Sequence, residues 1–228
     1  MSVRAAVIVA AAGSGRRMGS VNKAFLDLDG QPILMRSIRP FLADSRVCAV
    51  VVALDPATHD SPPSWLTSLD SRVSTVAGGT ERDDSIRLAL GAVPADVDVI
   101  VVHDAARPLV TPALIARAID EAAAGRAVTA AVPLADTIHQ VDGELRIVAT
   151  PDRSGLWRAQ TPQAFPAAML RNAHEVAFRT GLRATDDASL VARMAGPVHV
   201  IEGNEENLKI TVPADLHLAR ALLRTPET

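Results

Sequence analysis

Apolar and polar positions along this chain follow two alternating patterns. Short apolar runs rich in β-branched residues predict strands at residues 7–9, 47–54, 73–77, 97–102, 127–133 and 198–202. Between them, apolar residues spaced three to four apart predict helices that begin near residues 32, 80, 112, 166, 185 and 213. The run 97–102 is apolar on both faces, as in a central strand of a parallel sheet. The alternation predicts an α/β fold, Rossmann-like, with a mostly parallel sheet flanked by helices.

Capping residues mark several of the helix starts. Thr80 stands before one helix, Thr111 precedes a proline at the first position of another, and Thr185 or Asp186 opens a third.

Residues 55–71 hold three prolines and many small polar residues, which predicts a loop with a short helix around Trp65.

Three segments depart from the strand and helix alternation. Residues 136–151 alternate around Asp142-Gly143, which predicts a β-hairpin that projects from the sheet as an arm. Its apolar residues favour a partner surface, and dimerisation is the natural proposal. Residues 152–165 show little periodicity and are expected to form a functional loop. In the short extended piece 208–211, Lys209 lies between apolar neighbours; it either reaches solvent, the commoner arrangement, or points into a site.

The first predicted strand ends in a glycine turn followed by positive charge. Gly13 and Gly15 break the apolar run, and three cations come after the turn: Arg16, Arg17 and Lys23. Free backbone N–H groups and converging cations favour a binding site for an anion, in particular phosphate. Taken alone, the turn fits a structural role equally well. The stretch has no Gly-Lys pair and carries Met18 where a dinucleotide fingerprint needs glycine, so it is neither familiar phosphate motif.

Two further strand ends carry candidate chemistry. Gly78 and Gly79 allow close approach of a ligand between a strand and a helix, although a plain tight turn explains them as well. Asp104 and Arg107 follow the central strand at its carboxyl end, where ligands bind in open parallel sheets. They are candidates for metal and anion contacts. His103 is expected to pack inside the protein, because no second ligand stands at metal-binding spacing.

Composition narrows the class of protein. The 228 residues suit one domain, and a net charge of −3 with 3% aromatic residues and no tyrosine argues against a nucleic-acid partner. Cys48 is the only cysteine, which excludes an intrachain disulfide and favours core packing in a reducing cytoplasm. No signal segment and no bilayer-length apolar run is present in the sequence, so we expect a soluble cytoplasmic protein without a membrane partner.

Seven blocks of sequence, in order and with matching spacing, resemble one enzyme family. They are AAAGSGRRMG with Lys23, AGGTERDDS from Ala77, HDAARP from His103, ADT from Ala135, DRSGLWRAQTPQAF from Asp152, TDDAS from Thr185 and NLKIT from Asn207. They are similar to the 2-C-methyl-D-erythritol 4-phosphate cytidylyltransferase family, over nearly the whole chain. Ala10 replaces a usual proline and His139 a frequent lysine of the arm, and neither change removes a group assigned to chemistry.

The resemblance implies a fold of the nucleotide-diphospho-sugar transferase type. Residues 1–228 would be a single nucleotidyltransferase domain with residues 136–151 as the arm of a homodimer. The implied reaction transfers CMP from CTP to 2-C-methyl-D-erythritol 4-phosphate, giving 4-diphosphocytidyl-2-C-methyl-D-erythritol and pyrophosphate, in the non-mevalonate isoprenoid pathway. Mg²⁺, held mainly by the CTP phosphates, would offset their charge.

The same resemblance assigns roles residue by residue. The catalytic cations are Arg17 and Lys23. CTP would be bound by Ala11, Ala12, Gly13, Ser14, Gly15, Arg16, Gly79, Thr80 and Ser85. The acceptor would be bound by Asp104, Ala105, Arg107, Thr137, Arg153 and Lys209, with Thr137 and Arg153 supplied by the partner chain.

Two other functions fit the same residues. One is a cytidylyltransferase for another polyol phosphate, such as ribitol 5-phosphate. The other is a nucleotide-binding regulator without catalysis, which the retention of Arg17, Lys23 and Lys209 disfavours because binding alone does not require all three.

Overall fold

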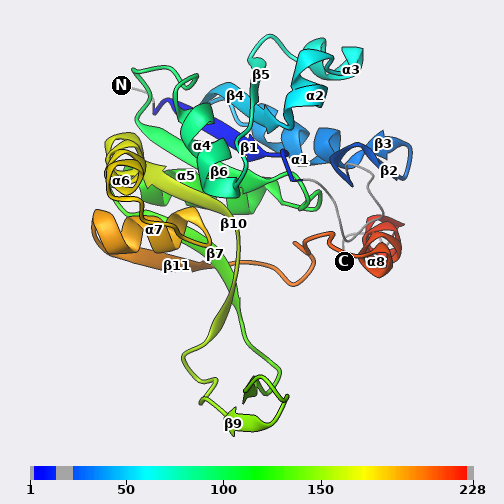
Figure 1. Cartoon of the computed structure of the whole chain (residues 1–228). Helices are drawn as coiled ribbons and strands as arrows, with labels where there is room; N and C mark the ends of the chain where they lie inside the picture. Colours follow the sequence, from blue (N-terminus) through cyan, green and yellow to red (C-terminus); the bar gives the residue numbers. More distant parts are fainter. Residues whose placement is uncertain (1–2, 14–22, 225–228) are drawn as a thin grey trace.

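A seven-stranded sheet forms the centre of the computed structural model, which describes residues 3–13 and 23–224. The strand order is β11-β7-β10-β6-β1-β4-β5, and every pair is parallel except the two that involve β10. The strands are β1 (Ala5–Ala10), β4 (Val47–Leu54), β5 (Val73–Ala77), β6 (Val99–Asp104), β7 (Ala127–Pro133), β10 (Trp157–Pro166) and β11 (Val198–Glu202). The predicted α/β fold with a mostly parallel sheet is confirmed (Figure 1).

Helices cover both faces of this sheet (Figure 1). They are α1 (Ile33–Leu42), α2 (Pro56–Asp60), α3 (Ser64–Thr67), α4 (Arg82–Leu90), α5 (Pro112–Ala123), α6 (Ala167–Thr180), α7 (Asp187–Met194) and α8 (Pro213–Arg224), with a short 3₁₀ turn at Lys23–Phe25. Two small pairs lie outside the main sheet: β2 (Asp27–Leu28) with β3 (Gln31–Pro32), and β8 (Gln140–Val141) with β9 (Ile147–Ala149). None of the described helices could cross a membrane.

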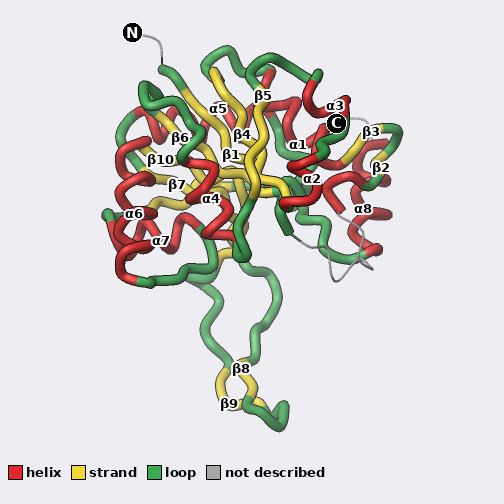
Figure 2. The backbone as a smooth tube through the Cα atoms, turned by 45° about the horizontal axis from the view of Figure 1, so that its top comes forward, coloured by secondary structure: helices red, strands yellow, loops and turns green. Residues whose placement is uncertain are grey.

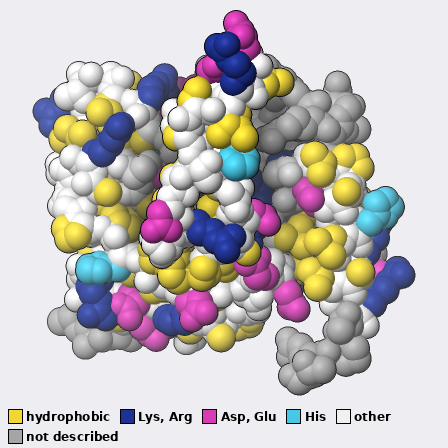
Figure 3. Space-filling model, turned by 90° about the horizontal axis from the view of Figure 1, so that it is seen from below, with side chains coloured by type: hydrophobic (Ala, Val, Ile, Leu, Met, Phe, Trp, Pro, Cys, Tyr) yellow, Lys and Arg dark blue, Asp and Glu magenta, His cyan; other side chains and the backbone are white. Residues whose placement is uncertain are grey.

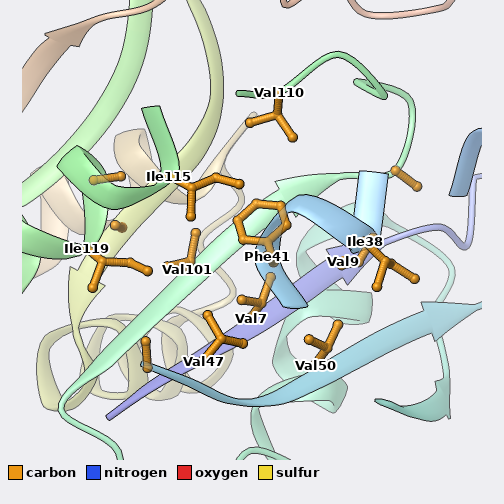
Figure 4. Close-up of a cluster of buried hydrophobic side chains, with 14 of the residues drawn as sticks. Val7, Val9, Ile38, Phe41, Val47, Val50, Val101, Val110, Ile115 and Ile119 are labelled. Carbon is orange, nitrogen blue, oxygen red and sulfur yellow. The ribbon is translucent and has the colours of Figure 1, made fainter. Parts of the chain in front are cut away.

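The alternation of side chains along β1 builds a core on each face. Val7 and Val9 point to the layer of α1 and α5, where Phe41 is fully buried (Figure 4). Ala6 and Ile8 point to the opposite layer of α4, α6 and α7. Because both faces are covered, the central strands are apolar throughout, which is why their sequence shows runs rather than alternation.

Most of the predicted boundaries agree with the structure. Thr111 caps α5 by accepting from the N–H of Leu114, and Asp186 opens α7 with a capping box. Thr80 is not a cap, because α4 follows Glu81, whose side chain makes no capping bond. The central strand is β6, two residues later than predicted, and residues 55–71 form two short helices rather than one.

The predicted loop 152–165 is wrong over its second half. Residues 157–166 form β10, which lies antiparallel between β6 and β7 and is buried from Gln160 to Phe165. Its polar side chains hide the strand pattern, since they are buried with hydrogen-bond partners from distant segments. Residues 208–211 lack regular secondary structure.

The hairpin around Asp142 is confirmed and projects from the sheet (Figures 1 and 2). Asp142 closes its tip by accepting from the backbone N–H groups of Glu144 and Arg146. Leu145 is 81% exposed and Ile147 59% exposed. From below, apolar and charged side chains are interspersed over this side of the molecule (Figure 3). Exposed apolar residues on an arm of this kind favour a protein partner.

Candidate active site

The carboxylate of Asp104 is the centre of a buried ionic cluster at the carboxyl end of β6. Its Oδ2 lies 2.6 Å from Nζ of Lys209, and its Oδ1 lies 3.4 Å from Nε of Arg82. Burial would raise the pKa of Asp104, but the charges of Arg82 and Lys209 outweigh it and lower the pKa below its ordinary value. Asp104 is therefore ionised, and Lys209, with 40% of its side chain exposed, points into the site rather than to open solvent.

A chain of hydrogen bonds fixes the backbone under this carboxylate. The N–H of Asp104 donates to Oγ1 of Thr161 at 3.0 Å, and Thr161 lies 3.0 Å from Nδ1 of His103. The other ring nitrogen of His103 lies 3.1 Å from the carbonyl oxygen of Arg107, to which it can only donate. A neutral imidazole satisfies both contacts, and the expectation of a packed histidine is confirmed.

Residues 207–210 bring the last part of the chain against the end of β6. Arg107 donates to the carbonyl of Asn207 at 2.7 Å, and the N–H of Ile210 donates to the carbonyl of Ala106 at 2.8 Å. Lys23 then donates to the carbonyl of Ile210 at 3.1 Å. The two lysines of the chain are thus brought together, because Lys23 binds the carbonyl of Ile210, the residue that follows Lys209.

The glycine turn after β5 packs closely against the end of β1. A Cβ on Gly78 would lie 2.5 Å from Cβ of Ala12, and one on Gly79 would lie 2.4 Å from Cβ of Asp84. The N–H of Gly79 donates to Oγ of Ser85 at 3.0 Å. Both glycines are therefore required for space. Through them, Ala12 at the end of β1 lies close to Gly79 and Ser85, which are also predicted to bind CTP.

Several predicted site residues are not placed with this cluster. Ser14, Gly15, Arg16 and Arg17 lie outside the described residues. Ala11 is buried and Gly13 is exposed at the end of β1, whereas Thr80 is exposed beyond the turn. Thr137 is exposed on the arm and Arg153 is exposed at its base, where it donates to the carbonyl of Ala135. Within one chain the arm leads away from the sheet (Figure 2).

Three charged or polar contacts of the site were not predicted. Arg82 bridges Asp104 and Asp187, and Asp187 pairs with His174. Arg82 and Asp187 stand in the blocks AGGTERDDS and TDDAS, so the sequence contained the signal but not the pairing.

The described residues contain no group of three or more His, Cys, Asp or Glu side chains that could hold a metal ion. A separate pocket of about 190 Å³ between α4, α6 and α7 is lined by residues that include Asp84, His174 and Phe178. It contains none of the predicted site residues.

Comparison with known proteins gives one result over the whole chain. The family described as 2-C-methyl-D-erythritol 4-phosphate cytidylyltransferase matches residues 5–225. The protein of that name from Symbiobacterium thermophilum is 43% identical over 224 residues, covering 98% of this chain and 94% of the relative. The one from Frankia casuarinae is 44% identical, with 97% and 82% covered.

Solved structures agree with the sequence matches. The crystal structure of 2-C-methyl-D-erythritol 4-phosphate cytidylyltransferase from Thermus thermophilus has a TM-score of 0.82 at 34% identity, covering 99% of this chain and 100% of that one. A 4-diphosphocytidyl-2C-methyl-D-erythritol synthase from Anaerococcus prevotii has a TM-score of 0.85 at 25% identity, with 98% and 97% covered.

The buried His103 predicts a loss of stability in mild acid. Burial lowers its pKa from 6.5 to about 4, so between these values the unfolded chain binds a proton that the folded chain does not. The free energy of unfolding should therefore fall as pH drops through this range, by about 2–3 kcal/mol from this residue. The lowered pKa of Asp104 causes a further fall in the free energy of unfolding mainly below about pH 4, where the carboxyl of the unfolded chain binds a proton.

Urea unfolding of the wild type and of His103→Gln, measured at several pH values from 7 to 4.5, checks this. The variant should show a shallower loss of stability with acid. Equal slopes for the two proteins would contradict a neutral buried histidine.

Proposed function

The chain belongs to the 2-C-methyl-D-erythritol 4-phosphate cytidylyltransferase family, and we infer that the cluster around Asp104 belongs to its active site. The enzyme transfers CMP from CTP to 2-C-methyl-D-erythritol 4-phosphate in the non-mevalonate isoprenoid pathway. The observation that carries the site assignment is the convergence of Lys23, Lys209 and Asp104, which belong to distant parts of the chain, at the carboxyl end of β6.

The chemistry requires charge control rather than a protein nucleophile. A phosphate oxygen of the acceptor attacks the α-phosphorus of CTP, a new P–O bond forms, and the bond to the pyrophosphate oxygen breaks. The acceptor phosphate is already an anion, so the barrier lies in bringing two anions together and in the charge of the five-coordinate transition state. Fixed cations lower that barrier. We propose Lys23 and Arg17 for this role at the triphosphate.

The two substrates are proposed to occupy adjoining positions along one edge of the sheet, at the carboxyl ends of its parallel strands. CTP is proposed to lie against Ala11, Ala12 and Gly13 and against Gly79, Thr80 and Ser85, where the close packing of Gly78 on Ala12 leaves a narrow turn suited to a pyrimidine. Ser14, Gly15 and Arg16, also proposed for CTP, lie outside the described residues. The acceptor lies beside Asp104, Ala105 and Arg107, with its hydroxyl groups on the carboxylate of Asp104 and its phosphate on Lys209. The side chain of Lys209 is 40% exposed beside Asp104, so it is accessible to a bound anion.

The arm is proposed to complete this site in a homodimer. Thr137 on the arm and Arg153 at its base are exposed, and the arm leads away from its own sheet, so both residues are available to a second chain (Figure 1). The exposed Leu145 and Ile147 supply apolar area for that contact. The whole chain would then act as one nucleotidyltransferase domain with residues 136–151 as the dimer arm.

The donor set fits a metal ion that is carried by the nucleotide. Asp104 pairs with both Lys209 and Arg82, and the described residues hold no group of three acidic, histidine or cysteine side chains that could bind a metal ion by themselves. Mg²⁺ often takes one or two carboxylates with substrate phosphates for the rest. Bound in this way, Mg²⁺ would neutralise part of the triphosphate charge.

The single reduced cysteine, Cys48, is consistent with our proposal of a cytoplasmic location.

Pyrophosphate release tests the acceptor. With CTP and Mg²⁺ we expect rapid release with 2-C-methyl-D-erythritol 4-phosphate and little with ribitol 5-phosphate, because the named relatives at 43–44% identity share the first acceptor. Preference for ribitol 5-phosphate would select the other polyol enzyme, and no release with either would select the regulator. Neither alternative is favoured by the comparisons.

Replacement of Lys23 tests the charge at the triphosphate. Lys23→Ala should lower kcat by about 10²–10³-fold, the usual cost of losing a preorganised charge donor in a transition state. Steady-state pyrophosphate assays measure this. Arg179→Ala is a matched control, since Arg179 is an exposed residue of α6 paired with Glu175. A Lys23→Ala enzyme within a few-fold of wild type would exclude Lys23 from the mechanism.

Replacement of Arg153 tests its contact with the acceptor. Arg153→Ala should raise the KM for the acceptor with little change in the KM for CTP.

Mixed dimers of the Arg153→Ala and Lys23→Ala variants test which chain of the dimer supplies Arg153 to each site. If each site takes Lys23 from one chain and Arg153 from the other, an equal mixture with Lys23→Ala, unfolded and refolded together, should recover roughly a quarter of wild-type activity, because half of the dimers then carry one intact site. A mixture no more active than the two variants measured separately would place both residues in one chain.

A further inference from the structure

Arg82 lies between two buried carboxylates at the first position of α4. Its Nε is 3.4 Å from Oδ1 of Asp104, and its Nη1 is 2.6 Å from Oδ2 of Asp187. Burial alone would lower the pKa of Arg82, but the charges of Asp187 and Asp104 outweigh it and raise the pKa. The guanidinium is therefore charged, and its planar fork faces both acids at once.

Asp187 is fixed from its other side by His174. Only 1% of Asp187 and 4% of His174 is exposed, and Oδ1 of Asp187 lies 2.9 Å from Nε2 of His174. Burial would raise the pKa of Asp187, but Arg82 and His174 outweigh it and lower the pKa. Each oxygen of Asp187 thus has a partner, one on α4 and one on α6. Asp187 is therefore held in a fixed position from which it pairs with Arg82.

We propose that Arg82 is a positioning residue for Asp104, and that the buried Asp187–His174 pair sets the direction of its guanidinium. The inference rests on the function proposed above, in which Asp104 and Lys209 receive the acceptor. Lys209 lies on Oδ2 of Asp104 and Arg82 on Oδ1, so the two cations fix the rotation of the carboxylate. Without Arg82 the carboxylate can turn toward Lys209 with both oxygens and draw its ammonium away from the acceptor phosphate.

The expected kinetic signature is confined to the acceptor. Arg82→Gln should lower kcat/KM for 2-C-methyl-D-erythritol 4-phosphate by about 10²-fold, the size of effect that a misplacement of about 1 Å produces. Asp187→Asn should lower it by about 10-fold, because Arg82 keeps its charge but loses its orientation. The KM for CTP should stay within about two-fold of wild type in both variants, which also shows that the fold is intact.

A double-mutant cycle separates positioning from a second, independent effect. If Asp187 acts only through Arg82, adding Asp187→Asn to Arg82→Gln should cause no further loss in kcat/KM for the acceptor. Losses that multiply would overturn the proposal, as would an equal loss for CTP and the acceptor. Wild-type enzyme that released no pyrophosphate would instead refute the proposed function.

His174 provides a matched pair of substitutions. His174→Gln keeps an N–H donor toward Asp187, whereas His174→Leu removes it at similar volume. We expect the kcat/KM for the acceptor to be retained in His174→Gln and to fall several-fold in His174→Leu, while the KM for CTP is the same in both. This result would support an effect of His174 on Asp104 through Asp187 and Arg82. Equal values for the two would contradict it. Arg183→Gln is the control. Arg183 is exposed and pairs with Asp83 and Asp84 of α4, the helix that carries Arg82, and the activity of this variant should equal that of the wild type.

Discussion

A negative charge in the protein interior governs this site. A buried carboxylate is stable only when cations and donors surround it, and leaving it unpaired is strongly destabilising. Asp104 obtains its cations from Arg82 and Lys209, which stand before and after it by 22 and 105 residues. Both segments must fold against β6 before the charge is compensated. The proposed acceptor side of the site therefore requires that both segments be packed against β6.

The irregular backbone of residues 207–210 makes that compensation possible. In a regular strand its carbonyl and N–H groups would be used by neighbouring strands. Here the carbonyl of Asn207 accepts from Arg107 and the carbonyl of Ile210 accepts from Lys23, while Lys209 between them reaches Asp104. One short segment without secondary structure thus connects the proposed triphosphate cation to the proposed acceptor cation.

Much of the fold could be predicted from sequence because it depends on local patterns. The strands β4, β5 and β11 begin and end where their apolar runs do. β10 escaped prediction because Gln160, Thr161 and Gln163 are buried polar residues whose partners, such as Asn207 and Thr129, are far along the chain. The site divides in the same way. Asp104 and Lys209 could each be proposed from the sequence as a candidate, but their pairing, and the contact of Arg82 with Asp187, join residues 105 apart that no periodicity connects.

The strand β10 links the arm to the interior, and this restricts where the chain can change in length. Its first residues pair with β7 at the base of the arm, and further along the same strand Thr161 accepts from the N–H of Asp104. Thr161 lies where the pairing of β10 with β7 shifts register, between Ala159 and Gln163, so an inserted or deleted residue in β10 would move Thr161 away from the N–H of Asp104. At the tip, Asp142 bonds only to its near neighbours Glu144 and Arg146 among the described hydrogen bonds of its side chain. Insertions and deletions should therefore be tolerated at the tip of the arm, around Asp142, and not in β10 at its base.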